Sequence, residues 1–225
     1  MLHLPSASRP DPSAGSSNAS PGIRLFTLLT ALLLAALAAC GTPEVGPPEP
    51  PDPLTPEQAA RATQVGGPAA GALAEELVGR LAQAIDEEGL AGAVDFCADA
   101  AMPLTREVQE RTDPPLALKR ATLRWRNPDN AADEWEERVL HYLAALEEAD
   151  PDGVPAELTA RGPGESLRYY RVLRTAPMCL NCHGAVESIE PEVRQLLSER
   201  YPDDRATGYE AGELRGVIRV EVPQG

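Results

Sequence analysis

Two cysteines and a histidine share the stretch Cys179-Leu180-Asn181-Cys182-His183, and this C-x-x-C-H spacing constrains the chain more than any other feature. At this spacing two thiols bond the vinyl carbons of one haem, and the histidine becomes an axial ligand of the iron. With 4 cysteines and 3 histidines in 225 residues, chance would produce the pattern on the order of 0.001 times per chain. The motif therefore predicts one covalent haem c.

Three other interpretations of the motif each lack a companion feature. A four-ligand zinc site needs a second Cys or His pair, whereas His3 and His141 are isolated. A thioredoxin-like redox pair would follow a strand and open a helix within a βαβ pattern, whereas here Pro177 precedes the motif and Gly184 ends it. A structural disulfide between the two cysteines is the third alternative.

The N-terminus indicates export. An apolar run from Ile23 to Ala36, with Arg24 near its start, has the length of a signal-peptide core and is too short for a transmembrane helix. It ends in Leu37-Ala38-Ala39-Cys40, which resembles a bacterial lipobox. We expect residues 1–39 to be a lipoprotein signal peptide, Cys40 to be lipidated, and the protein to be anchored on the periplasmic side of a bacterial membrane. A plain membrane anchor or an ordinary secreted cleavage site is the alternative.

Beyond Cys40, composition separates a tether from a domain. Residues 40–56 are rich in proline and acidic side chains, which cannot bury enough apolar area to order themselves. Residues 57–225 have the length of one domain with its own core. The formal net charge of −15 disfavours nucleic acid and anionic lipid surfaces as partners. It suits either a basic redox partner or a solvated acidic surface.

Hydrophobic periodicity predicts an α+β fold. Apolar residues at four-residue steps predict a helix over residues 70–88 that stops at Gly89, and a second helix from Leu90. A third apolar stripe predicts a helix over residues 133–148. Alternation of residues between two faces predicts strands over 116–126 and 166–175. A segment rich in valine and isoleucine predicts a further strand over 214–222. Helices followed by strands favour a meander-like antiparallel sheet partly covered by helices.

Cys97 is the one cysteine left without a role. If Cys40 carries lipid and the C-x-x-C-H cysteines carry haem, Cys97 has no disulfide partner in an oxidising compartment. It lies on an apolar helical stripe, so it is either a small buried packing residue or the second axial ligand of the iron. The pattern alone does not separate these two roles.

A family resemblance favours the ligand role. The segments that carry it are Phe96-Cys97-Ala98, 120–124, 126–130 with Trp135-Glu136, 178–184 and 212–216. Over roughly residues 77–222 the chain resembles bacterial c-haem domains formerly catalogued as of unknown function. The resemblance implies a PAS-like fold with one haem, and the family's cyanobacterial representative has His/Cys ligation. By that similarity His183 is the proximal ligand and Cys97 the second.

Other polar and sulfur side chains are candidates for the haem surroundings. Met102 and Met178 suit packing better than ligation, and His141 falls on the solvent side of its helix. Arg120, Arg124 and Arg126 alternate on one face of the predicted strand, so their guanidinium groups either bind haem propionates or form a solvated basic stripe.

The expected function is single-electron transfer or redox sensing. A thiolate ligand lowers the reduction potential of haem iron, so ligation by Cys97 predicts a low-potential site. No output segment is recognisable in the chain, and a signal would leave through a redox partner or a separate signalling protein. The alternatives are sensing of a diatomic gas such as NO or CO, and peroxidase-like catalysis. Catalysis would need an open iron position and distal acid and base groups, which are not evident.

Overall fold

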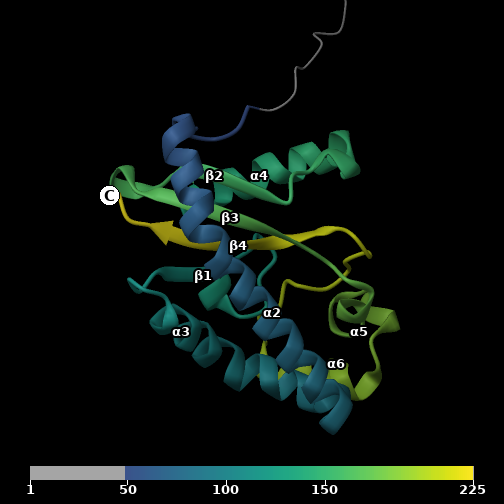
Figure 1. Ribbon diagram of the computed structural model, residues 1–225. Helices are drawn as coiled ribbons and strands as arrows, with labels where there is room; N and C mark the ends of the chain where they lie inside the picture. The colour runs from purple at the N-terminus through teal and green to yellow at the C-terminus, as the bar shows by residue number, and fades with distance from the viewer. Residues whose placement is uncertain (1–48, 225) are drawn as a thin grey trace, which may run out of the picture. The chain divides into compact units, whose positions relative to one another are not determined.

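The computed structural model describes residues 49–224 (Figure 1). The predicted signal peptide, the lipidation site Cys40 and most of the predicted tether lie outside these residues, and the proposed domain boundaries stay predictions. The helices are α2 (Pro56–Asp95), α3 (Ala101–Arg111), α4 (Glu134–Ala149), α5 (Leu180–His183) and α6 (Pro191–Arg200). The strands are β1 (Ala117–Ala121), β2 (Glu157–Arg161), β3 (Leu167–Arg174) and β4 (Leu214–Val222).

The four strands form one antiparallel sheet in the order β1-β4-β3-β2. β4, the last strand, pairs with both β1 and β3, so its valine and isoleucine run lies in the middle of the sheet. The predicted α+β class and antiparallel sheet are confirmed, and β3 and β4 match their predicted spans closely. The short edge strand β2 was not predicted, and PAS-likeness stays a prediction.

Helices cover both faces of the sheet. Leu118, Tyr169 and Ile218 pack with α2 residues in one core cluster. Tyr170 and Val217 pack with α4 residues in another. Because successive strand residues point to opposite faces, neighbouring positions serve the two cores. α2 crosses its face of the sheet diagonally in Figure 1.

α2 starts earlier than the periodicity predicts. Thr55 caps it with a reciprocal capping box to Gln58, and the helix begins at Pro56 instead of residue 70. Its first turns are rich in alanine and glycine and hence lack the leucine stripe on which the prediction rested. Gly89 has a φ of 72° and interrupts the helix where the stop was predicted, after which helical structure resumes.

The predicted strand over residues 116–126 is wrong beyond Ala121. β1 ends there, and the Thr122 hydroxyl accepts from the Arg124 amide at 3.2 Å and donates to the Arg215 carbonyl at 2.9 Å. Such side-chain bonds to the backbone replace ladder bonds and turn the chain away. Arg124 and Arg126 therefore lie in a loop and not on a strand face with Arg120.

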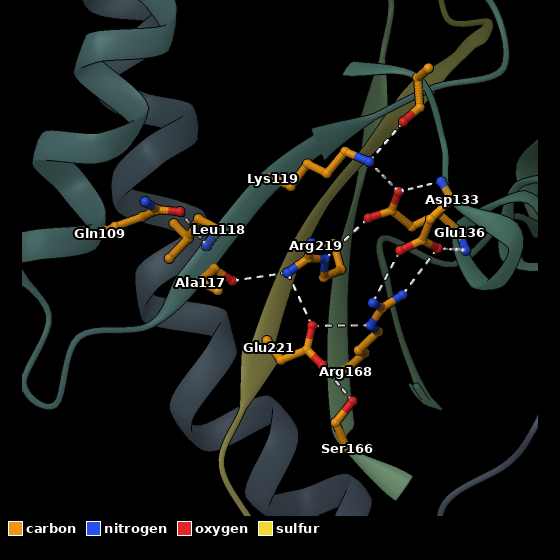
Figure 2. A network of polar contacts seen from close by, with 11 residues as sticks. Gln109, Ala117, Leu118, Lys119, Asp133, Glu136, Ser166, Arg168, Arg219 and Glu221 are labelled. Atoms are coloured by element: carbon orange, nitrogen blue, oxygen red, sulfur yellow. Dashed lines mark hydrogen bonds and ion pairs between the residues drawn. The ribbon is translucent and has the colours of Figure 1, made fainter. Parts of the chain in front are cut away.

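Charged groups join α4 to its face of the sheet (Figure 2). The Glu136 side chain is fully buried, and its carboxylate accepts from Lys119 Nζ at 2.8 Å and from Arg219 Nε at 3.1 Å. Arg168 on β3 donates to both carboxylate oxygens of Asp133, the N-cap of α4. α4 is thus fixed to three strands by its first turn.

Candidate functional site

The C-x-x-C-H motif forms a single tight turn of helix. A 3-10 turn, Pro177–Cys179, leads directly into α5, and Gly184 follows with extended backbone. Neither motif cysteine forms a disulfide bond within the part of the chain that the structure describes. The motif therefore presents two thiols and an imidazole from one short helical segment.

The His183 imidazole is held in one tautomer. Its Nδ1 lies 2.6 Å from the Ala206 carbonyl oxygen, and since a carbonyl only accepts, Nδ1 carries the proton. Burial, reinforced by the positive charges of Arg126 and Arg215, lowers the pKa of His183 well below its usual value. The ring is thus neutral with an unprotonated Nε2, the form in which histidine binds a metal.

Backbone hydrogen bonds fasten this turn to the segment before β4. The Gly208 amide donates to the Gly184 carbonyl at 2.7 Å, and the Tyr209 amide donates to the His183 carbonyl at 2.9 Å. The Tyr209 ring stands edge-on to the His183 ring, with centroids 6.2 Å apart. The motif and the segment from Asp204 to Tyr209 thus form one packed unit.

Three of the arginines around this unit are engaged by protein groups. Arg126 donates to Asp204, Cys182 and Ala206. Arg124 forms an ion pair with Glu213 at 2.9 Å and stacks on the Tyr209 ring, 3.7 Å from its centroid. Arg215 approaches the same ring and donates to its hydroxyl at 3.4 Å. Sequence reasoning missed Arg215, although it lies within residues 212–216, which carry the family resemblance.

Cys97 lies in the five-residue π-helix Phe96–Ala100, which joins α2 to α3. Burial raises the pKa of its thiol, the positive charges of Arg120 and Arg126 oppose that effect, and the nearby Cys179 adds to it. Cys182 and Ala98 pack against one apolar cluster that is formed by Val94 of α2 together with residues of α6 and its flanks. The fold therefore brings the Cys97 turn to the C-x-x-C-H motif, although the two are far apart in sequence.

Arg120 differs from the other arginines of the site. Its Nη2 donates to Met102 Sδ at 3.3 Å, but its Nε is buried and has no hydrogen-bond partner among residues 49–224. Met102 thus contacts an arginine, and His141 is exposed as predicted. Within residues 49–224 no three His, Cys, Asp or Glu side chains gather closely enough to hold a metal ion.

Comparison with known proteins identifies the family. The family model described as Tll0287-like matches residues 42–223. The chain belongs to the Tll0287-like family. Among solved structures, the cyanobacterial heme-protein Tll0287 is 25% identical, with 66% of this chain and 96% of that chain covered and a TM-score of 0.43. No curated protein matches the chain.

The Tll0287-like match includes the C-x-x-C-H motif, Cys97 and the arginines around them. Cys40 lies just outside it. No helix within residues 49–224 combines the length and apolar character needed to cross a bilayer.

Proposed function

We propose that this Tll0287-like protein carries one haem c and transfers or senses single electrons. Cys179 and Cys182 form the thioether bonds, and His183 is the proximal ligand. The observation that carries the proposal is the tautomer of His183, whose Nε2 is free to bind iron beside two free thiols. The family membership supports it, because a heme-protein gives the family its name.

The described residues fit a haem in their donor chemistry. A thiol pair, a neutral imidazole and a third thiol at Cys97 supply the attachment and both axial ligands. The unpartnered, buried Nε–H of Arg120 is a donor in need of an acceptor, which a propionate would provide. Arg124 and Arg126 already have protein partners, so Arg120 is the strongest propionate candidate of the three.

The bound haem supplies a one-electron iron couple, and the chain tunes it. His183 keeps its orientation through Ala206, and Cys97 would supply a thiolate ligand, which stabilises ferric iron and lowers the potential. We further propose a PAS-like fold, anchoring on the periplasmic side of a bacterial membrane through lipidated Cys40, and exchange of electrons or signals with a separate partner protein.

The π-helix around Cys97 supports a second candidate function. π-turns inside helical segments are frequent at functional sites, and Cys97 lies in one that follows the Gly89 interruption of α2. Release of Cys97 on reduction would open an iron position to a diatomic gas such as NO or CO. Binding of CO by the reduced protein distinguishes this function from simple electron transfer.

Covalent attachment is tested first. The full chain is expressed with a haem c attachment system, and haem is followed on a denaturing gel and by mass spectrometry. Wild type is expected to retain one haem, and the double variant Cys179→Ser/Cys182→Ser none. Wild-type protein without covalent haem would overturn the proposal.

The Cys97→Ala variant tests the second ligand. We expect it to keep its covalent haem, to lose the low-spin thiolate signature in ferric EPR spectra, and to have a raised midpoint potential, because the thiolate donor is gone. Met102→Ala is the matched control and should keep the wild-type spectrum. Identical spectra for wild type and Cys97→Ala would rule out ligation by Cys97.

A further inference from the structure

Arg126 is a buried cation that bonds two segments of the site at once. Its side chain is 9% exposed. Nε donates to Asp204 Oδ2 at 2.9 Å, and Nη2 donates to the Cys182 carbonyl at 2.6 Å and to the Ala206 carbonyl at 3.4 Å. One guanidinium therefore connects the attachment motif to the segment that follows α6.

Asp204 completes this connection. Its Oδ2 pairs with Arg126 while its Oδ1 accepts from the Ala206 amide at 2.8 Å. Ala206 is consequently held at both its N–H and its C=O, and it is fully buried. The Ala206 carbonyl is the group to which His183 Nδ1–H donates.

We infer that Arg126 and Asp204 are positioning residues that set the orientation and electronic character of His183 through the Ala206 carbonyl. This inference rests on the proposed function. A hydrogen bond at the second ring nitrogen fixes the plane of a ligating imidazole and its basicity. Arg126 is thus assigned to the proximal ligand and not to a propionate.

The pair also places opposite charges beside the iron site. Loss of the Arg126 cation favours the ferric state and lowers the midpoint potential, whereas loss of the Asp204 carboxylate raises it. A merely structural pair would behave differently, because either substitution would loosen the same site and move the potential in the same direction.

The test uses holoprotein of the full chain in four variants: Arg126→Gln, Arg126→Lys, Asp204→Asn and Arg205→Gln. Arg205 is the matched control, since it is an exposed neighbour of Asp204 in sequence and its guanidinium stacks on the Trp125 ring. Redox titration gives the midpoint potential, and ferric EPR reports the orientation of the axial ligand.

For Arg126→Gln we expect the ratio of ferrous to ferric iron at a fixed potential to fall about tenfold, a shift of about 59 mV for a one-electron couple. Asp204→Asn should shift it in the opposite direction. Arg126→Lys keeps the charge but not the forked geometry, so it should restore the potential and leave the EPR g-values altered. Arg205→Gln should match wild type in both.

Shifts of the same sign in Arg126→Gln and Asp204→Asn, or unchanged EPR spectra in both, would overturn the inference. If Arg126→Gln does not fold, the direction of the shift in the near-isosteric Asp204→Asn decides. Failure of the proposed function is a separate result, because it appears as wild-type protein without covalent haem.

Discussion

At the scale of single residues, Glu136 is the most consequential polar side chain outside the site. It is fully buried between Lys119 and Arg219, so Glu136→Gln removes the carboxylate that pairs with Lys119 and leaves Arg219 paired with Glu221 alone. Breaking a buried pair by removing one partner costs about 3–5 kcal/mol. We expect that loss in urea unfolding at neutral pH. Glu134→Gln, two residues earlier and exposed, should change stability by less than about 0.5 kcal/mol, and equal effects of the two variants would contradict the role of the network.

At the scale of elements, two glycines of α2 give opposite predictions for the same substitution. A Cβ at Gly66 would lie 2.5 Å from Tyr169 Cβ on β3, whereas one at Gly79 meets nothing within 4 Å. Gly66→Ala should destabilise the protein by about 1–3 kcal/mol, since it forces the helix off the sheet. Gly79→Ala should stabilise it by up to about 1 kcal/mol through helix propensity. Thermal unfolding of both variants checks the close approach, and a stabilised Gly66→Ala would refute it.

The contribution of the N-terminus of α4 to the stability of the fold depends on pH. Burial raises the pKa of Asp133, but hydrogen bonds from Arg168 and from the Glu136 amide outweigh it, so the pKa is lowered overall. A lowered pKa stabilises the fold above the unfolded-state value of about 3.9, and this contribution is lost as the pH falls through the folded-state pKa. Asp133→Asn keeps the cap but removes the charge. Its stability deficit at pH 7 should shrink below about pH 4 in denaturant titrations, and a deficit independent of pH would contradict this.

At the scale of the whole molecule, the net charge of −15 should control encounter rates. We expect oxidation of the reduced holoprotein by the cation hexaammineruthenium(III) to slow as salt is added, because screening weakens attraction. Oxidation by the anion hexacyanoferrate(III) should accelerate. Stopped-flow rates at several ionic strengths measure both slopes, and slopes of equal sign would show that the net charge does not govern approach to the iron.

Local patterns predict much of this fold and less of its site. The α4 and β4 spans follow from periodicity, because each has one continuous apolar pattern. β1 ends early because the Thr122 hydroxyl forms hydrogen bonds with the backbone. An alternating pattern of residues in the sequence does not predict such bonds. Likewise the sequence identifies Arg126 as a candidate residue but not its partners Asp204 and Ala206. These partners lie in a loop far away in sequence, which the tertiary fold brings to Arg126.

The attachment motif lies between two strands that pair with each other. β3 and β4 are neighbours, and the segment between them is closed at its base by hydrogen bonds from Thr175 to Glu213 and from Gly212 to Thr175. Its length can change during evolution without altering the register of the sheet. Cys97, the proposed second ligand, belongs to a different part of the chain, between α2 and α3. Under the proposed ligation, the two sides of the haem would therefore be able to diverge separately, and new chemistry on the Cys97 side could arise on an unchanged C-x-x-C-H loop.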